Sequence, residues 1–110
     1  MQVIKDAGSY TRPGPGAGNH WSEHLRVADL SVGTYSVPSG GTDDQVPHTE
    51  DEIYVVVSGR AVIEAGSGQA AVAAGSVIFV PAGETHRFTG ITEDLALLVV
   101  FGPAEGSRES

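Results

Sequence analysis

Between Trp21 and Phe101 the sequence is a succession of short apolar and β-branched runs separated by turn signals. Glycine and proline mark the turns, for example at 38–41 and 81–83, because tight turns often need the positive φ that glycine adopts without strain. The pattern predicts strands at about residues 24–30, 33–37, 45–48, 52–58, 60–65, 69–73, 77–80, 86–89 and 95–101. Short strands with regularly spaced turns are typical of an all-β sandwich or barrel.

The length of 110 residues fits one domain with a single core. We expect residues 1–20 to form an N-terminal segment with a Gly- and Pro-rich loop, residues 21–103 to form the domain, and residues 104–110 to be a flexible tail. No apolar run approaches the roughly 20 residues of a transmembrane helix, and no signal-peptide pattern opens the sequence. We therefore expect a cytoplasmic protein.

The acidic composition limits the partners of this chain. The formal net charge is −8, and the six Lys and Arg residues cannot offset the phosphates of nucleic acid or of an anionic membrane. The chain has no cysteine, so a metal site would have to use nitrogen and oxygen donors. No Ser-His-Asp order, phosphate-binding glycine loop or basic aromatic patch supports a hydrolase, a nucleotide enzyme or an RNA binder. The expected partner is a small molecule.

Two imidazoles and one carboxylate form the most specific chemical signal in the sequence. His48, Glu52 and His86 are the residue types of a mononuclear 2-His-1-carboxylate metal site. Alternate residues of a strand share a face, so Glu52 and Tyr54 should point one way and Ile53 the other. His86 follows a Pro-Ala-Gly turn at the start of a predicted strand. Side chains from strands far apart in the sequence converge inside a small barrel.

The two segments that carry these residues resemble the two motifs of the cupin family. Residues of the first motif stand at Gly40, His48, Glu52 and Gly59, and residues of the second stand at Gly75, Pro81, Gly83 and His86. Gly90 occupies a position where the second motif usually has asparagine, and the fifteen residues between Gly59 and Gly75 resemble a minimal cupin. The resemblance implies an all-β fold, a small jelly roll or double-stranded β-helix barrel.

The first motif departs from the family pattern at its first histidine. Val46 stands at that position, and the amide oxygen of the neighbouring Gln45 could turn inward at a bulge. The resemblance thus implies three metal ligands, His48, Glu52 and His86, with Gln45 or water in the fourth place. Losing an imidazole leaves more of the coordination sphere open for a substrate or for dioxygen.

Other polar residues around the first motif have simpler interpretations. We expect Glu50 and Asp51 to be solvent-facing charges that oppose edge-to-edge pairing, and Asp43 and Asp44 to be turn residues. Trp21 is expected to pack over the mouth of the pocket or at a subunit contact.

Three functions remain open on this basis. The favoured one is a metalloenzyme in which Fe, Mn, Zn or Ni binds a small oxygenated molecule, with Glu52 and Tyr54 as candidate catalytic residues. Iron would allow a dioxygenase, and the other ions would favour isomerase or cyclase chemistry. The second is a binding or sensor protein without turnover, and the third is a structural cupin that associates with a partner.

The resemblance also implies a homodimer. The strand predicted at 52–58 would place Ile53, Val55 and Val57 on its outer face, where they would leave an apolar strip exposed on a single chain.

Overall fold

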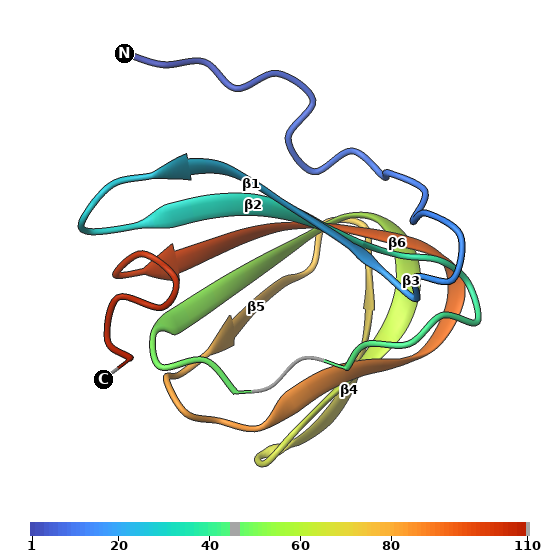
Figure 1. Ribbon diagram of the computed structural model, residues 1–110. Helices are drawn as coiled ribbons and strands as arrows, with labels where there is room; N and C mark the ends of the chain where they lie inside the picture. The colour runs from blue at the N-terminus through green and yellow to red at the C-terminus, as the bar shows by residue number, and fades with distance from the viewer. Residues whose placement is uncertain (45–46, 110) are drawn as a thin grey trace.

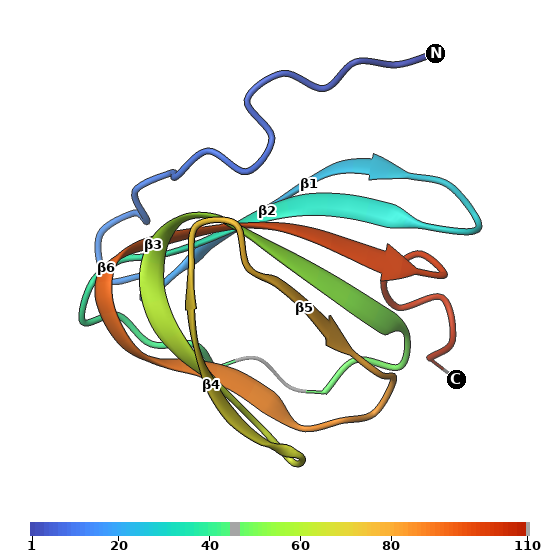
Figure 2. The ribbon, with the colours of Figure 1, turned by 180° about the vertical axis from the view of Figure 1, so that it is seen from behind.

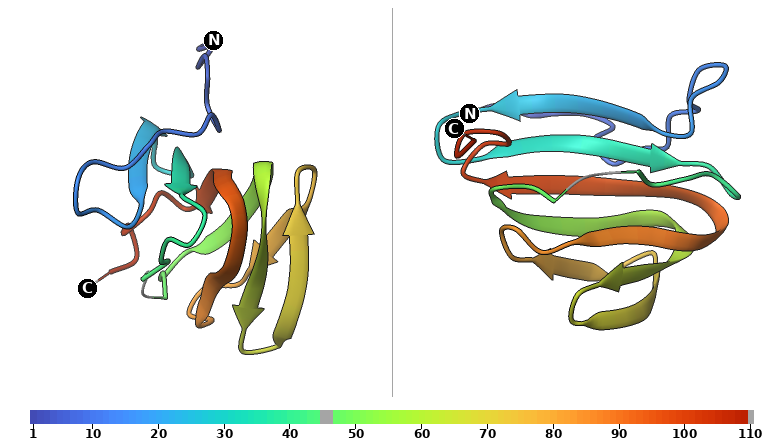
Figure 3. Two further views of the ribbon diagram at one scale, coloured as in Figure 1. Left: turned by 90° about the vertical axis from the view of Figure 1, so that its right-hand side faces the viewer. Right: turned by 60° about the horizontal axis from the view of Figure 1, so that its bottom comes forward.

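The computed structural model describes residues 1–44 and 47–109, which contain strands and no helix, as predicted (Figure 1). The strands are β1 (His20–Arg26), β2 (Ser31–Val37), β3 (Asp51–Ala65), β4 (Gly68–Ala73), β5 (Val77–Val80) and β6 (His86–Gly102). They pair antiparallel in the order β1-β2-β6-β3-β4, with β5 also paired to β3 (Figure 3). No helix in these described ranges is long and apolar enough to cross a membrane.

The two longest strands, β3 and β6, form the spine of the barrel. They are paired from Asp51 opposite Gly102 to Ala65 opposite His86, and the pair curls along its length (Figures 1 and 2). The first half of β3 also pairs with β5, and the second half pairs with β4. The sequence pattern predicted two strands where the structure has β3 (52–58 and 60–65) and two where it has β6 (86–89 and 95–101). In the structure β3 and β6 are each continuous through the predicted break.

The strands predicted at 52–58 and 60–65 imply a turn at Gly59, but the structure has an irregularity within β3 there. Gly59 has a φ of 97°, and a Cβ there would lie 2.3 Å from the carbonyl oxygen of Asp94. Tyr54 and Val56 are buried before it, whereas Ile63 is buried after it, so the inward parity changes from even to odd numbers. A bulge that inserts one residue makes this change, and both halves of β3 therefore face the core.

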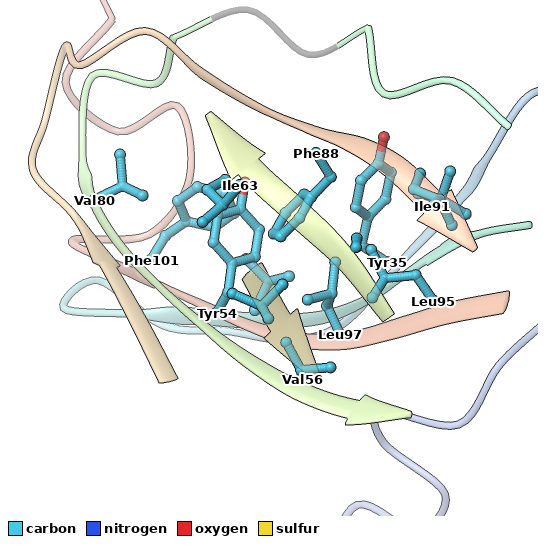
Figure 4. Packing of buried hydrophobic residues seen from close by; sticks show 14 residues of the cluster. Tyr35, Tyr54, Val56, Ile63, Val80, Phe88, Ile91, Leu95, Leu97 and Phe101 are labelled. Carbon is cyan, nitrogen blue, oxygen red and sulfur yellow. The ribbon is translucent and has the colours of Figure 1, made fainter. Parts of the chain in front are cut away.

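The core consists of side chains that point into the barrel from β2, β3, β4, β5 and β6 (Figure 4). Within it Tyr54 packs edge-on against Phe88, with ring centroids 4.9 Å apart. Burying such rings and branched side chains supplies the main favourable free energy of folding. On β6, Leu98 and Val100 are only half-buried, so the apolar run 95–101 is fully buried on one face alone.

The segment before β3 differs from the strand predicted at 45–48. Residues 45 and 46 lie outside the described residues, and Pro47 and His48 are not in a strand. The N-terminal segment is attached to β2, since the N–H of Gly8 donates to Oγ1 of Thr34 at 2.7 Å and that of Thr11 donates to Oγ of Ser36 at 3.0 Å.

Exposed apolar side chains gather on the outer face of β3 and β5. This apolar patch consists of Ile53, Val57, Val77 and Phe79, and Ile53 lies opposite Phe79 in the ladder. Exposed patches of this kind mark association surfaces in many proteins. The homodimer stays a prediction, and the patch is the surface on which we expect it to form.

We expect a dimer by light scattering at micromolar concentration. Phe79→Ser removes the aromatic ring of the patch. We expect it to shift the molar mass in solution to that of a monomer, with little change in melting temperature. Val3→Ser is the matched control, because Val3 is also exposed but lies outside the patch. A monomeric unaltered protein would contradict the prediction.

Candidate functional site

A pocket of about 350 Å³ opens into the barrel, a volume suited to a small organic molecule. Its lining combines three aromatic rings, three carboxylates and one imidazole: Asn19, Trp21, Tyr35, Asp44, His48, Glu52, Val99, Phe101 and Glu105. Trp21 lies edge-on to Tyr35 and Phe101, with ring centroids 6.5 and 6.2 Å apart. The pocket therefore has packed aromatic walls and an acidic lining.

Glu52 is the most unusual residue of the pocket. It is 1% exposed, and within the described part of the chain neither carboxylate oxygen has a hydrogen-bond partner. Buried carboxylates are normally paired, because removing a charge from water costs several kcal/mol. The nearest cationic candidate is His86, whose Nε2 lies 3.1 Å from Oε1 of Glu52.

His86 is held with Nε2 toward Glu52. Its Nδ1 lies 2.8 Å from the carbonyl oxygen of Glu84. A carbonyl only accepts, so Nδ1 carries the proton and Nε2 holds a lone pair in the neutral ring. The Tyr54 hydroxyl, 2.9 Å away, donates to that lone pair. The short distance to Glu52 is thus a hydrogen bond only when the ring is protonated.

The pKa of His86 reflects two opposed effects. Burial by itself lowers this pKa, since it disfavours the charged ring. The Glu52 carboxylate and the Glu84 carbonyl outweigh burial and raise the pKa above its usual value. The site therefore attracts positive charge.

His48 lies on the same pocket, in the segment before β3. Its carbonyl accepts a 2.8 Å hydrogen bond from the N–H of Gly83, which joins the two motif segments directly. Its ring centroid is 6.2 Å from that of His86, and its Nδ1 is 3.5 Å from Oε2 of Glu105. The side chain of Asp51 adds to the same junction by accepting from the N–H of Ala82 at 2.9 Å.

The structure thus brings two of the predicted ligands, Glu52 and His86, into contact. Glu52 and His48 line the pocket, whereas His86 lies behind Glu52 and is not among the lining residues. In residues 1–44 and 47–109, no three His, Asp or Glu side chains form a group ready to hold a metal ion. Gln45 lies outside the described residues. The complete ligand set stays a prediction.

Glu50 was expected to face solvent, and that expectation is wrong. It is 1% exposed, and its carboxylate accepts from the N–H groups of Gly106 and Arg108, at 2.8 and 3.0 Å, and from the Thr49 hydroxyl. Burial would raise the pKa of Glu50, but these donors hold it below its usual value. Glu50 attaches the segment after β6, expected to be a flexible tail, to the barrel.

Asp43 also has a role that the sequence pattern does not indicate. It is buried, and its carboxylate accepts from the Tyr35 hydroxyl and from the N–H of Phe88, both at 2.8 Å. Burial, with Asp43 beside the hydroxyl, raises the pKa of Tyr35. Asp43 therefore fixes the Tyr35 ring as a wall of the pocket. No local motif distinguishes it from a turn aspartate.

Comparisons with known proteins agree with this architecture. A family model described as "Cupin domain" matches residues 33–101. A Streptomyces coelicolor protein, printed as "Uncharacterized protein SCO3923", is 53% identical over 83 residues, which cover 76% of this chain and 79% of that protein.

Two solved structures show the same fold. TT1209 from Thermus thermophilus has 25% identity and a TM-score of 0.77, over 92% of this chain and 97% of that one. A Klebsiella pneumoniae protein with a double-stranded β-helix domain has 23% identity and a TM-score of 0.79, over 94% and 91% of the two chains.

The turn that joins the two motif segments gives a stability prediction. Gly83 has a φ of 81°, and no atom lies within 4 Å of a Cβ built there, so the cost of a side chain is backbone strain rather than a clash. We expect Gly83→Val to lower the free energy of unfolding by about 1–3 kcal/mol. Gly66→Val is the control, since Gly66 lacks a positive φ and its Cβ would make only an ordinary contact. Equal losses in urea unfolding would contradict this reasoning.

Proposed function

The chain belongs to the cupin family, and from that premise we propose that it binds a small oxygenated organic molecule through a divalent metal ion held by His48, Glu52 and His86. The observation that carries the proposal is the buried Glu52 carboxylate without a hydrogen-bond partner among the described residues, beside the lone pair of His86. The metal and the activity are both part of the proposal.

A bound cation would balance the buried negative charge of Glu52. While the His86 ring is neutral, the buried Glu52 carboxylate has no donor among the described residues, which is costly, and a bound divalent ion would remove that cost. The Nδ1–H of His86 donates to a backbone carbonyl, the arrangement that commonly orients a metal-binding imidazole. A donor set of imidazole nitrogens and carboxylate oxygens, without sulfur, suits Fe, Mn, Zn or Ni.

The third ligand, and the second imidazole nitrogen, would come from His48, which lines the pocket beside Glu52. The backbone bond between His48 and Gly83 ties this segment to the turn that leads to His86. Gln45, or water in its place, remains the predicted fourth ligand. The open part of the site faces a pocket with aromatic walls, which would cover the apolar parts of a bound molecule.

A bound metal would supply Lewis-acid activation of an oxygenated substrate, or dioxygen activation if it is iron. Glu52 would be the candidate proton acceptor, in a role that requires its carboxylate to leave the metal. Tyr54 was predicted to be catalytic, but it is not among the residues that line the pocket, and its hydroxyl bonds to His86. We assign Tyr54 the role of holding the His86 ring in the metal-free site, because a metal ion on Nε2 would take the lone pair to which the hydroxyl donates.

The alternative is a binding or sensor protein that uses the same pocket without turnover. The pocket favours both of these readings over a purely structural cupin, since its volume of about 350 Å³ is not filled by core side chains. Dioxygenase and isomerase or cyclase chemistry would use the same protein residues, so the bound metal would separate them.

Glu52→Gln tests the proposal in two ways. At a pH well above the raised pKa of His86, where the ring is neutral, we expect it to raise the stability of metal-free protein by about 1–3 kcal/mol, because it removes a buried charge that then lacks a donor. We also expect it to abolish high-affinity binding of Zn, Mn or anaerobic Fe(II) in titration calorimetry.

Glu93→Gln is the matched control, since Glu93 is exposed and pairs with Arg60 on the outer surface. It should change neither quantity appreciably. Undiminished metal affinity in Glu52→Gln would contradict the proposal.

A further inference from the structure

The residues after β6 fold back against the barrel next to the start of β3 (Figure 1). Three of their backbone N–H groups donate hydrogen bonds to side chains of the barrel and of the segment before β3. Glu105 donates to Oγ of Ser31 at 2.9 Å, and Gly106 and Arg108 donate to Glu50 at 2.8 and 3.0 Å. Ser31 and Glu50 are both 1% exposed, so this segment is attached to buried acceptors at Glu105 itself and at the residues that follow it.

This attachment places the Glu105 side chain in the pocket. Glu105 lines the pocket together with His48 and Glu52, and its Oε2 lies 3.5 Å from Nδ1 of His48. Both side chains of this pair are largely covered, at 28% and 16% exposure. At 3.5 Å the contact is longer than a hydrogen bond, but it puts an acceptor on the Nδ1 side of the ring.

Each imidazole of the candidate site has an oxygen atom near its Nδ1, at hydrogen-bond distance in His86 and at a longer contact distance in His48. Nδ1 of His86 faces the carbonyl oxygen of Glu84 at 2.8 Å, and Nδ1 of His48 faces the carboxylate of Glu105. An oxygen acceptor on Nδ1 keeps the proton there and leaves the lone pair on Nε2, which is how carboxylates orient metal-binding histidines.

We propose that Glu105 is a positioning residue of this site, which holds the proton on Nδ1 of His48 and so makes Nε2 the metal donor. The inference rests on the proposed function of the pocket. It also gives the C-terminal segment a role, since Glu50 and Ser31 fix the backbone from which Glu105 reaches the pocket. A segment that only covered the barrel would not need a carboxylate at this position.

The first test uses metal-free protein and long-range ¹H–¹⁵N spectra, which distinguish protonated from unprotonated ring nitrogens. We expect His48, assigned with a His48→Gln variant, to carry its proton on Nδ1. In Glu105→Gln the amide can donate as well as accept, and this preference should weaken. Glu109→Gln is the matched control, because it makes the same change in the same segment at an exposed residue outside the pocket lining.

The second test is Zn affinity by calorimetry. We expect Glu105→Gln to bind about 10- to 100-fold more weakly, the usual effect of removing a carboxylate that orients a metal-binding histidine. Glu109→Gln should bind like the unaltered protein, and Glu105→Asp should recover part of the loss. Unchanged circular dichroism and melting temperature in Glu105→Gln would show that the effect is local.

The outcomes separate the two claims. If the unaltered protein binds Zn and Glu105→Gln matches it in both affinity and His48 tautomer, the role of Glu105 is overturned and the metal site stands. If the unaltered protein binds no divalent metal, the proposed function falls, and so does the donor role of Nε2. A changed His48 tautomer in Glu105→Gln would then still support the positioning contact itself.

Discussion

The candidate site depends on the bend in the long β3–β6 ladder. Glu52 lies near one end of this ladder, opposite Phe101, and His86 lies at the other end, opposite Ala65. In a straight ladder these side chains would be far apart, yet Oε1 of Glu52 and Nε2 of His86 are 3.1 Å apart. The irregularity at Gly59, where only glycine fits against the Asp94 carbonyl, allows the strands to curl. The curl that closes the barrel therefore also brings Glu52 and His86 together.

A second constraint is the conflict at Glu52 between the stability of the fold and the proposed binding of a metal ion. The core would be more stable with a neutral, hydrogen-bonded or apolar residue in this place, since buried charges without donors are costly. Sites that bind ligands commonly retain such costs. The polar groups around Glu52 are satisfied by comparison: Asp43, Glu50 and His86 are buried, and each has a hydrogen bond that fixes it. This contrast between Glu52 and its neighbours is the basis of the proposal that a cation binds at Glu52.

Much of the fold and part of the site could be predicted from the sequence. Turn spacing and the motif residues indicated an all-β cupin, and strand parity correctly placed Glu52 and Tyr54 on the inner face. Gly59 was misread as a turn because a bulge glycine and a turn glycine look alike without knowledge of pairing. Glu50, Asp43 and Glu105 escaped notice for a similar reason: their partners are 8 to 58 residues away, so no local pattern identifies them.

The most direct test of this account is anomalous diffraction from crystals grown with Zn or Mn and without chelator. The account predicts one strong anomalous peak in the pocket, within about 2.0–2.2 Å of a Glu52 oxygen and of Nε2 of His86, and in contact with His48. A structure in which Glu52 stays without a metal ion, while Zn or Mn is present in excess, would contradict it.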